Sequence, residues 1–187
     1  MKLLSSALLV SSLLAASAHA ALISGPSNIT ATTSLIGAVG FSAVSQIVDG
    51  IDLNTDGPTF NGFRSNGVTS GSITLTLNTS YNLNQFLLAN DINVQSEGIG
   101  AFNLDFYGTS GFISNASGFT AAQGLVAAQT FNFATVAGVN KVVLNITSAP
   151  AGRIEIREVA FNSTVPEVSS AMLGALGVLG FASRRRR

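Results

Sequence analysis

The chain of 187 residues contains no cysteine and no tryptophan, and its single histidine, His19, lies near the N-terminus. The lack of cysteine excludes disulfides, so an exported domain of this chain must be held by its core or by a metal. Residues 21–163 contain neither His nor Cys. This excludes Ser-His-Asp and Cys-His catalysis and the usual zinc ligands there, and it predicts a domain that is not an enzyme.

Charge is also scarce, at 10% of the residues. The nine basic residues balance the nine acidic ones only because Lys2 and Arg184, Arg185, Arg186 and Arg187 are counted. Residues 21–163 carry four basic and eight acidic side chains, a net charge of about −4. A mildly acidic domain is a poor partner for nucleic acid, so no nucleic-acid binding is expected.

The first twenty residues have the order of a secretory signal. Lys2 is followed by an apolar stretch rich in Leu and Ala, which closes on Ala18-His19-Ala20. The small residues Ala18 and Ala20 suit the pocket of signal peptidase, so residues 1–20 are predicted to form a signal helix that is cleaved after Ala20. The alternative is a short buried helix.

The last residues, 164–187, form a second appendage. Val165-Pro166-Glu167-Val168 precedes an apolar segment over residues 169–183 and the arginine run 184–187. Counted from Val168 to Ser183, a helix of sixteen residues spans about 24 Å, less than the ~30 Å hydrocarbon core of a bilayer. The arginines favour the cytoplasmic side, which predicts a short transmembrane helix with the domain outside.

This tail resembles the PEP-CTERM sorting signal of exported bacterial proteins. The resemblance implies recognition by the membrane protease-transpeptidase exosortase, with Val165, Pro166, Glu167 and the four arginines as sorting residues and cleavage near Pro166-Glu167. It also implies a Gram-negative-type bacterium and transfer from the membrane to the cell surface or extracellular matrix. Val168 departs from the common third-position proline. The alternative is a permanent membrane anchor.

Residues 21–163 are predicted to be all-β. Apolar and polar residues alternate over 72–78, 102–107, 131–134, 141–146 and 154–161. Turns rich in Gly, Ser and Asn are expected at 108–111 and 137–140. Several strands with one apolar face predict two packed antiparallel sheets, an antiparallel β-sandwich or jelly roll.

The last of these strands breaks its own alternation. Ile154 and Ile156 have one parity, whereas Val159 and Phe161 have the other. All four can face the core only if a β-bulge lies near Arg157-Glu158. Such a bulge is expected to direct the Glu158 carboxylate toward a neighbouring loop.

Residues 45–57 provide a loop that can receive it. Asp49, Asp52 and Asp56 lie here among Gly, Asn and Thr. Hard oxygen donors on a turn are the ligands that Ca²⁺ prefers, although the spacing is not that of an EF-hand. The alternative is a solvated turn rich in Asp and Asn.

The order of an Asp-Gly loop, SITLTLNTSYNLNQFLL, GIGAFNLDFYGTSG, TFNFATVAGVNKVVLNIT and a closing IREVAF resembles the discoidin or coagulation-factor type C domain of the galactose-binding-like superfamily. The resemblance covers residues 43–163. It implies a structural Ca²⁺ held by Asp49 and Glu158, with Asp52 or Thr55 and loop carbonyls as further ligands. It also implies carbohydrate or matrix polymer as the partner.

The best ligand-binding candidate in the sequence is Phe60, Asn61, Phe63 and Arg64. Phe rings can stack on a sugar while Asn and Arg bond its hydroxyls. The alternative is that Phe60 and Phe63 fill the edge of the core.

The leading hypothesis is therefore an exported, non-catalytic β-sandwich that binds carbohydrate or exopolysaccharide at the cell surface. Three alternatives remain: a purely structural matrix or biofilm component, a glycan-active enzyme that uses carboxylates, and an ice-binding protein. The enzyme would use Asp91, Asp105 or Glu155. The ice-binding protein would use the short threonine ladders of 30–33 and 74–76.

Overall fold

The computed structural model describes residues 20–51, 61–90, 97–124 and 127–164. The predicted signal segment, apart from Ala20, and the predicted sorting segment, apart from Thr164, lie outside these ranges, as do Asp52, Thr55 and Phe60. No helix within the described ranges is long and apolar enough to span a membrane.

The described residues form antiparallel strands and one short 3₁₀ helix. The elements are β1 (Ala20–Ile23), β2 (Ile29–Thr33), the helix η1 (Val44–Val48), β3 (Phe63–Arg64), β4 (Gly71–Asn90), β5 (Ala101–Gly108), β6 (Gly111–Thr120), β7 (Gln129–Ser148) and β8 (Glu155–Thr164). Every strand pair is antiparallel. The all-β prediction is confirmed.

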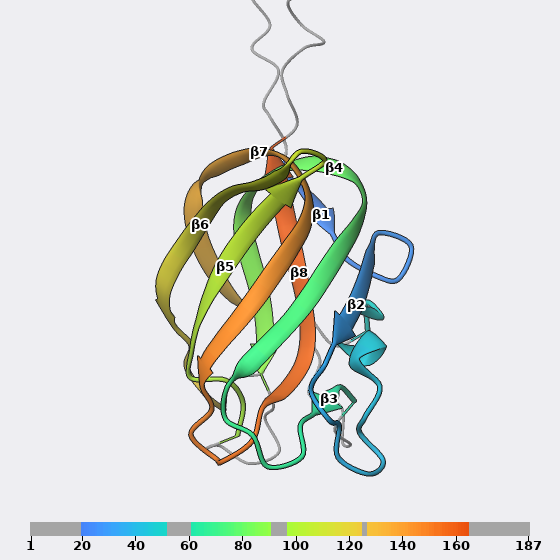
Figure 1. Ribbon diagram of the computed structural model, residues 1–187, viewed down its shortest axis with the longest axis vertical. Helices are drawn as coiled ribbons and strands as arrows, with labels where there is room; N and C mark the ends of the chain where they lie inside the picture. The colour runs from blue at the N-terminus through green and yellow to red at the C-terminus, as the bar shows by residue number, and fades with distance from the viewer. Residues whose placement is uncertain (1–19, 52–60, 91–96, 125–126, 165–187) are drawn as a thin grey trace, which may run out of the picture. The chain divides into compact units, whose positions relative to one another are not determined.

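The strands lie in two layers, and the long strands β4 and β7 belong to both (Figure 1). The front sheet consists of β2, residues 71–77 of β4, residues 141–148 of β7, β5 and β6. The back sheet consists of residues 129–136 of β7, residues 83–90 of β4, and β8, with β1 and β3 paired to β8. This arrangement is a β-sandwich in which two strands cross from one layer to the other.

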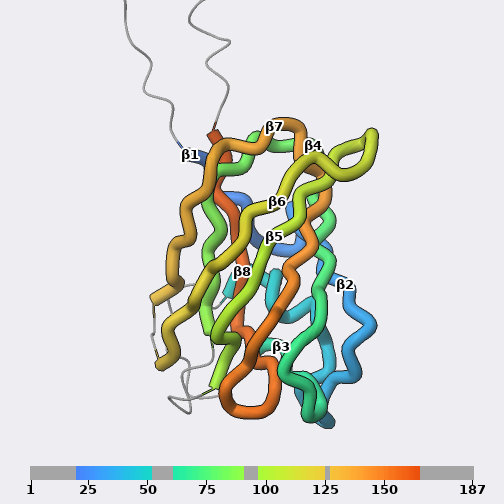
Figure 2. The backbone as a smooth tube through the Cα atoms, turned by 60° about the vertical axis from the view of Figure 1, so that its left-hand side comes forward, coloured from blue at the N-terminus to red at the C-terminus, as the bar shows by residue number. Residues whose placement is uncertain are grey.

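The predicted turn at 137–140 is wrong. β7 continues through these residues, and the expected strands 131–134 and 141–146 are its two halves. The pairing register with β4 shifts between Thr76 and Tyr81 and again up to Gln85, where both strands bend together. Gly138, with φ of 72°, allows the bend without a steric cost. The turn at 108–111, in contrast, joins β5 and β6 as predicted, and it projects at the end where β4 and β7 bend (Figure 2).

Phenylalanine rings from both layers form the centre of the core. Phe86 of β4 lies in the back sheet, and its ring centroid is 5.3 Å from that of Phe161 on β8. It is also 5.4 Å from Phe102 of β5 in the front sheet, which in turn is 4.9 Å from Phe131 of β7. Edge-to-face contacts of this kind add to the free energy gained by burying the rings. They connect the two sheets at their middle.

Replacing Phe86 by alanine is expected to lower the free energy of unfolding by about 3–5 kcal/mol, because the fully buried ring leaves a cavity between the layers. Phe112, which is 61% exposed, is the matched control, and Phe112→Ala should change stability by about 0.5 kcal/mol or less. Urea unfolding of the two variants measures both effects. Equal losses would contradict the assignment of Phe86 to the core.

Candidate functional site

The candidate site is built around the start of β8, where the predicted bulge is confirmed. Ala89 of β4 pairs with Glu158, whereas the next residue, Asn90, pairs with Ile156. Arg157 is therefore the extra residue of the bulge. As expected from the change of parity, the apolar side chains on either side of the bulge are all fully buried: Ile154, Ile156, Val159 and Phe161.

The bulge directs the Glu158 carboxylate to the loop that follows η1. The backbone N–H of Gly50 donates to Glu158 Oε1 over 3.1 Å. Gly50 has φ of 84°, a conformation that only glycine adopts readily, and a Cβ there would lie 3.3 Å from the Cα of Gly25. Since the Glu158 side chain is completely buried, this loop is held against β8 by a carboxylate that is withdrawn from water.

The Asp49 carboxylate also accepts hydrogen bonds that hold this loop in place. Its Oδ1 accepts the N–H of Ile51 over 3.0 Å, and its Oδ2 accepts the Asn61 amide over 3.1 Å. The Oδ1 of Asn61 accepts the amide of Gln46 over 3.2 Å. The two predicted calcium ligands Asp49 and Glu158 thus both accept N–H groups of the turn at Gly50.

The oxygen donors at this turn are of the kind that suits Ca²⁺: two carboxylates and the surrounding loop carbonyls. Among the described residues no group of three or more His, Cys, Asp or Glu side chains is placed to hold a metal. The other predicted ligands, Asp52 and Thr55, lie outside the described residues. In the described residues, Asp49 and Glu158 supply oxygen donors of the kind that suits a hard cation, and both accept N–H groups of the loop.

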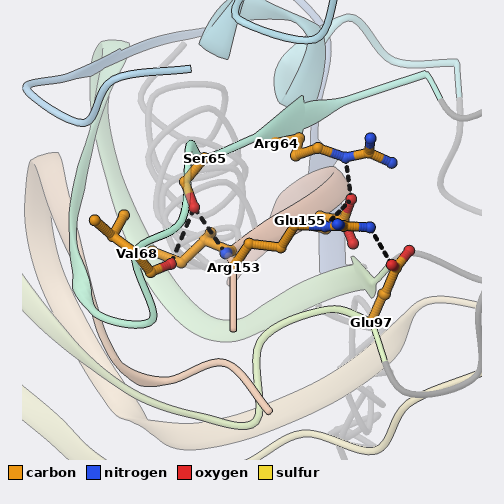
Figure 3. A network of polar contacts seen from close by, with 7 residues as sticks. Arg64, Ser65, Val68, Glu97, Arg153 and Glu155 are labelled. Carbon is orange, nitrogen blue, oxygen red and sulfur yellow. Dashed lines mark hydrogen bonds and ion pairs between the residues drawn. The ribbon is translucent and has the colours of Figure 1, made fainter. Parts of the chain in front are cut away.

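Figure 3 shows a second polar cluster, formed by side chains from β3, from the start of β8 and from the loops next to them. Arg64 on β3 is directly opposite Glu155 on β8 in the pairing register, and Arg64 Nε contacts Glu155 Oε1. Arg153 Nε lies 3.1 Å from the same oxygen, and its Nη2 contacts Glu97 Oε1. We call these four residues the arginine–glutamate network.

Burial explains why two cations share one carboxylate. The Glu155 side chain is 0% exposed, whereas those of Arg64 and Arg153 are 25% and 35% exposed. A buried carboxylate is costly unless ion pairs and hydrogen bonds compensate for the lost water. The Arg64 guanidinium also lies 4.6 Å from the centroid of the Phe41 ring. The loop end therefore presents two partly exposed, pre-oriented guanidinium groups.

Local packing positions this network. A Cβ at position 62 would overlap the carbonyl oxygen of Ile156, so Gly62 is what allows β3 to approach β8 closely. The hydroxyl of Ser65 accepts the N–H of Ile154 over 2.8 Å and donates to the carbonyl of Val68 over 3.0 Å. Figure 3 shows Ser65 joining the two loops next to the network.

The predicted ligand loop is divided between the core and this surface. Phe63 is fully buried, opposite Ile156, so the hypothesis that its ring stacks on a ligand is wrong and the ring fills the core instead. Asn61 spans Gln46 and Asp49, and Phe60 lies outside the described residues. Arg64 places a partly exposed guanidinium at the loop end.

Two of the carboxylates considered for an enzyme lie on different strands. Asp105 lies on β5, where its Oδ2 accepts the Asn145 amide over 2.8 Å. Glu155 is buried in the arginine–glutamate network, where it contacts Arg64 and Arg153. Asp91 lies outside the described residues. Asp105 and Glu155 thus each bond to partners of their own, on different strands of the sandwich.

Sequence reasoning missed Arg153, Glu97 and Phe41. Arg153 and Glu155 are two residues apart, a spacing that places side chains on one face of an extended segment, and this is a signal that could have been noticed. Glu97 contacts Arg153 from 56 residues away in the chain, and Arg64 contacts Glu155 from 91 residues away. No local pattern connects such positions.

Solved structures with the same fold include several sugar-binding modules. The family 32 carbohydrate-binding module of NanJ from Clostridium perfringens, solved with galactose, has a TM-score of 0.56 at 10% identity, covering 76% of this chain and 100% of that chain. The lectin domain of lectinolysin, complexed with Lewis b antigen, has a TM-score of 0.56 at 16% identity, covering 76% and 96%. An F5/8 type C domain from Bacteroides fragilis has a TM-score of 0.54 at 11% identity, covering 73% and 91%.

At these identities the likeness shows the fold, and the predicted discoidin-like sandwich is confirmed. The chain has the β-sandwich of discoidin domains and family 32 carbohydrate-binding modules. No sequence-family model matches the chain, and no curated protein does.

Proposed function

We propose that this protein is a non-catalytic carbohydrate-binding protein that binds sugar at the loop end of its sandwich. The observation that carries the proposal is the pair of partly exposed guanidinium groups, Arg64 and Arg153, held in place by the buried Glu155. Each guanidinium offers several N–H donors in a fixed plane, and a sugar offers vicinal hydroxyl acceptors. The ring of Phe41 lies next to Arg64 and supplies an apolar neighbour.

The fold supports the same function by analogy. The NanJ module was solved with galactose and the lectinolysin lectin domain with Lewis b antigen. Galactose and galactose-containing glycans are therefore the first ligands to test for this chain.

The proposed place of action is the cell surface or extracellular matrix. The basis is the order of the two termini: a charged and apolar start that ends on Ala18-His19-Ala20, and a Pro166-Glu167 step before an apolar segment and four arginines. Signal peptidase and exosortase are the proposed processing partners. The protein is held in the membrane by its C-terminal segment until that segment is removed.

A structural Ca²⁺ is proposed at the Gly50 turn. Asp49 and Glu158 would hold it, together with Asp52, Thr55 and loop carbonyls. When bound, the cation would supply charge compensation for the buried Glu158 and would stiffen the loop next to β3. It has no part in a reaction.

The sugar-binding proposal predicts that Arg153→Met weakens galactose binding. Loss of a charged donor should raise the Kd by about tenfold or more. Arg64 still pairs with Glu155 in this variant, so the fold should be retained. Isothermal titration measures the Kd, and Lys141→Met, which removes a cation from the front sheet, is the matched control. If wild-type protein binds neither galactose nor any glycan of a screening array, the purely structural matrix role is favoured.

The calcium proposal predicts a midpoint of thermal unfolding that depends on the cation. At a Ca²⁺ concentration of a hundred times the Kd, binding adds about 2.7 kcal/mol, which raises the midpoint by several degrees in a domain of this size. Glu158→Gln should abolish the difference between calcium and chelator, whereas Asp105→Asn on the front sheet should retain it. Identical wild-type curves with calcium and with chelator would rule out the site.

The sorting proposal predicts a mature protein that lacks both ends. Intact mass spectrometry of protein recovered from the producing bacterium should show loss of residues 1–20 and of the segment after the Pro166-Glu167 step. The double variant Pro166→Ala, Glu167→Ala should keep its C-terminal segment and stay in the membrane fraction. Val168→Pro, which restores the common motif, should be processed like the wild type. Detection of the full-length polypeptide as the only mature species would contradict the proposal.

A further inference from the structure

The outer face of the front sheet carries side chains in rows that run across its five strands. In one row, Thr30 of β2 pairs with Thr76 of β4, which pairs with Lys141 of β7. Lys141 pairs with Tyr107 of β5, and Tyr107 pairs with Phe112 of β6. Figure 1 looks onto this sheet, in which the five strands lie side by side. On β2, β4, β7 and β5 the inward residues next to the row are buried, so the row faces away from the core; they are Ala31, Leu75, Val142 and Phe106.

A β-bulge in β6 is what adds the second aromatic ring to this row. Phe106 pairs with Ser114, whereas the next residue, Tyr107, pairs with Phe112, so Ile113 is the extra residue. Without the bulge, Phe112 would share the inward side of Ser114. In the structure it is 61% exposed, and its ring lies 5.6 Å from that of Tyr107 at an angle of 74°. The sheet thus places two adjacent rings on its outer face.

Polar groups surround these rings. The next row consists of Thr32, Thr74, Val143, Asp105 and Asn115, in register across the same strands. Threonine hydroxyls, the Asn115 amide and the Asp105 carboxylate therefore lie on the same face of the sheet as the rings.

The charges on the two rows balance. Lys141 and Asp105 are the charged residues of the ten, and they have opposite sign. Lys141 Nζ lies 4.1 Å from the centroid of the Tyr107 ring, a cation–π contact that orients both side chains. The face is thus neutral and rich in hydrogen-bonding groups, with a single aliphatic side chain, Val143.

We propose that this face binds an extended, uncharged polysaccharide chain. Aromatic rings stack on the apolar faces of sugar rings, while hydroxyl and amide side chains bond the sugar hydroxyls. Five strands separated by about 4.8 Å make a row about 19 Å long, which is more than one sugar unit can cover. The occupant is therefore a chain that lies across the strands.

The composition of the face distinguishes this occupant from others. The centre of a protein–protein interface is typically apolar, with aromatic, Met and Arg side chains, whereas here four threonines and one asparagine fill half of the ten positions. A polyanion would require net positive charge, which Lys141 and Asp105 together do not provide. The face lies on strands and is independent of the loop-end site, so it goes beyond the function proposed above.

The test is affinity electrophoresis of the full chain in gels that contain linear galactan, mixed-linkage β-glucan, xylan or alginate. We expect at least one of the three neutral polymers to retard the wild-type protein. The double variant Tyr107→Ala, Phe112→Ala should raise the apparent Kd by about tenfold or more. Phe112→Trp should retain binding, and oligosaccharides of the retarding polymer should compete better as their length increases.

Two controls separate this face from the loop end and from general misfolding. Ile113→Ala removes an apolar side chain that is 42% exposed and next to Phe112 but outside the row, and it should leave retardation unchanged. Arg153→Met should weaken galactose binding without affecting retardation. The proposal is overturned if no neutral polymer retards the wild type, if alginate alone does, or if free galactose competes as well as the oligosaccharides. It is also overturned if the double variant is retarded normally, or if sedimentation shows that the two rings instead hold a dimer together.

Discussion

The central constraint on this structure is that β8 is buried on both sides although its first four residues include three ionisable ones. The bulge at Arg157 lets the buried strand contain these ionisable residues, because it places Ile156 and Val159 toward the core while Glu155 and Glu158 point elsewhere. A buried carboxylate requires compensation. Glu155 therefore attracts two arginines, and Glu158 attracts the Gly50 turn. The loops of the candidate site are therefore brought together by the buried carboxylates Glu155 and Glu158 of β8.

The two surfaces of the protein arise from different parts of the same architecture. The loop end depends on contacts between distant loops: Ser65 holds Ile154, and Arg153 reaches Glu97. The outer face of the front sheet depends only on strand register and on the bulge at Ile113. A loop end of this kind offers a few directional donors suited to a small sugar. A sheet face repeats its side chains at the strand spacing and suits a polymer.

Alternation of apolar and polar residues predicted the fold where strands have one buried face. It succeeded over 72–78 and 102–107, and the change of parity between Ile156 and Val159 correctly located the bulge of β8. It failed at 137–140. Gly138 and Asn140 are typical turn residues, but β7 continues through them and bends together with β4. It also gave no strand over 111–120, because β6 is an edge strand with two register shifts and few buried residues. Bulges at an edge remove the period on which such predictions depend.

The sequence by itself determined that the 21–163 domain has no His- or Cys-based chemistry, because this follows from composition. It also determined the two-sheet class and the direction in which Glu158 leaves its strand, because these follow from the alternation of residues along single strands. Only the tertiary structure decided that Phe63 belongs to the core while its neighbour Arg64 serves the surface, and that Tyr107 and Phe112 form one exposed pair. The reason is that these assignments depend on pairing register between separate strands, such as Arg64 opposite Glu155, which are 91 residues apart. A pattern within one strand gives its two faces, and only the partner strand decides which of them is buried and what lies beside it.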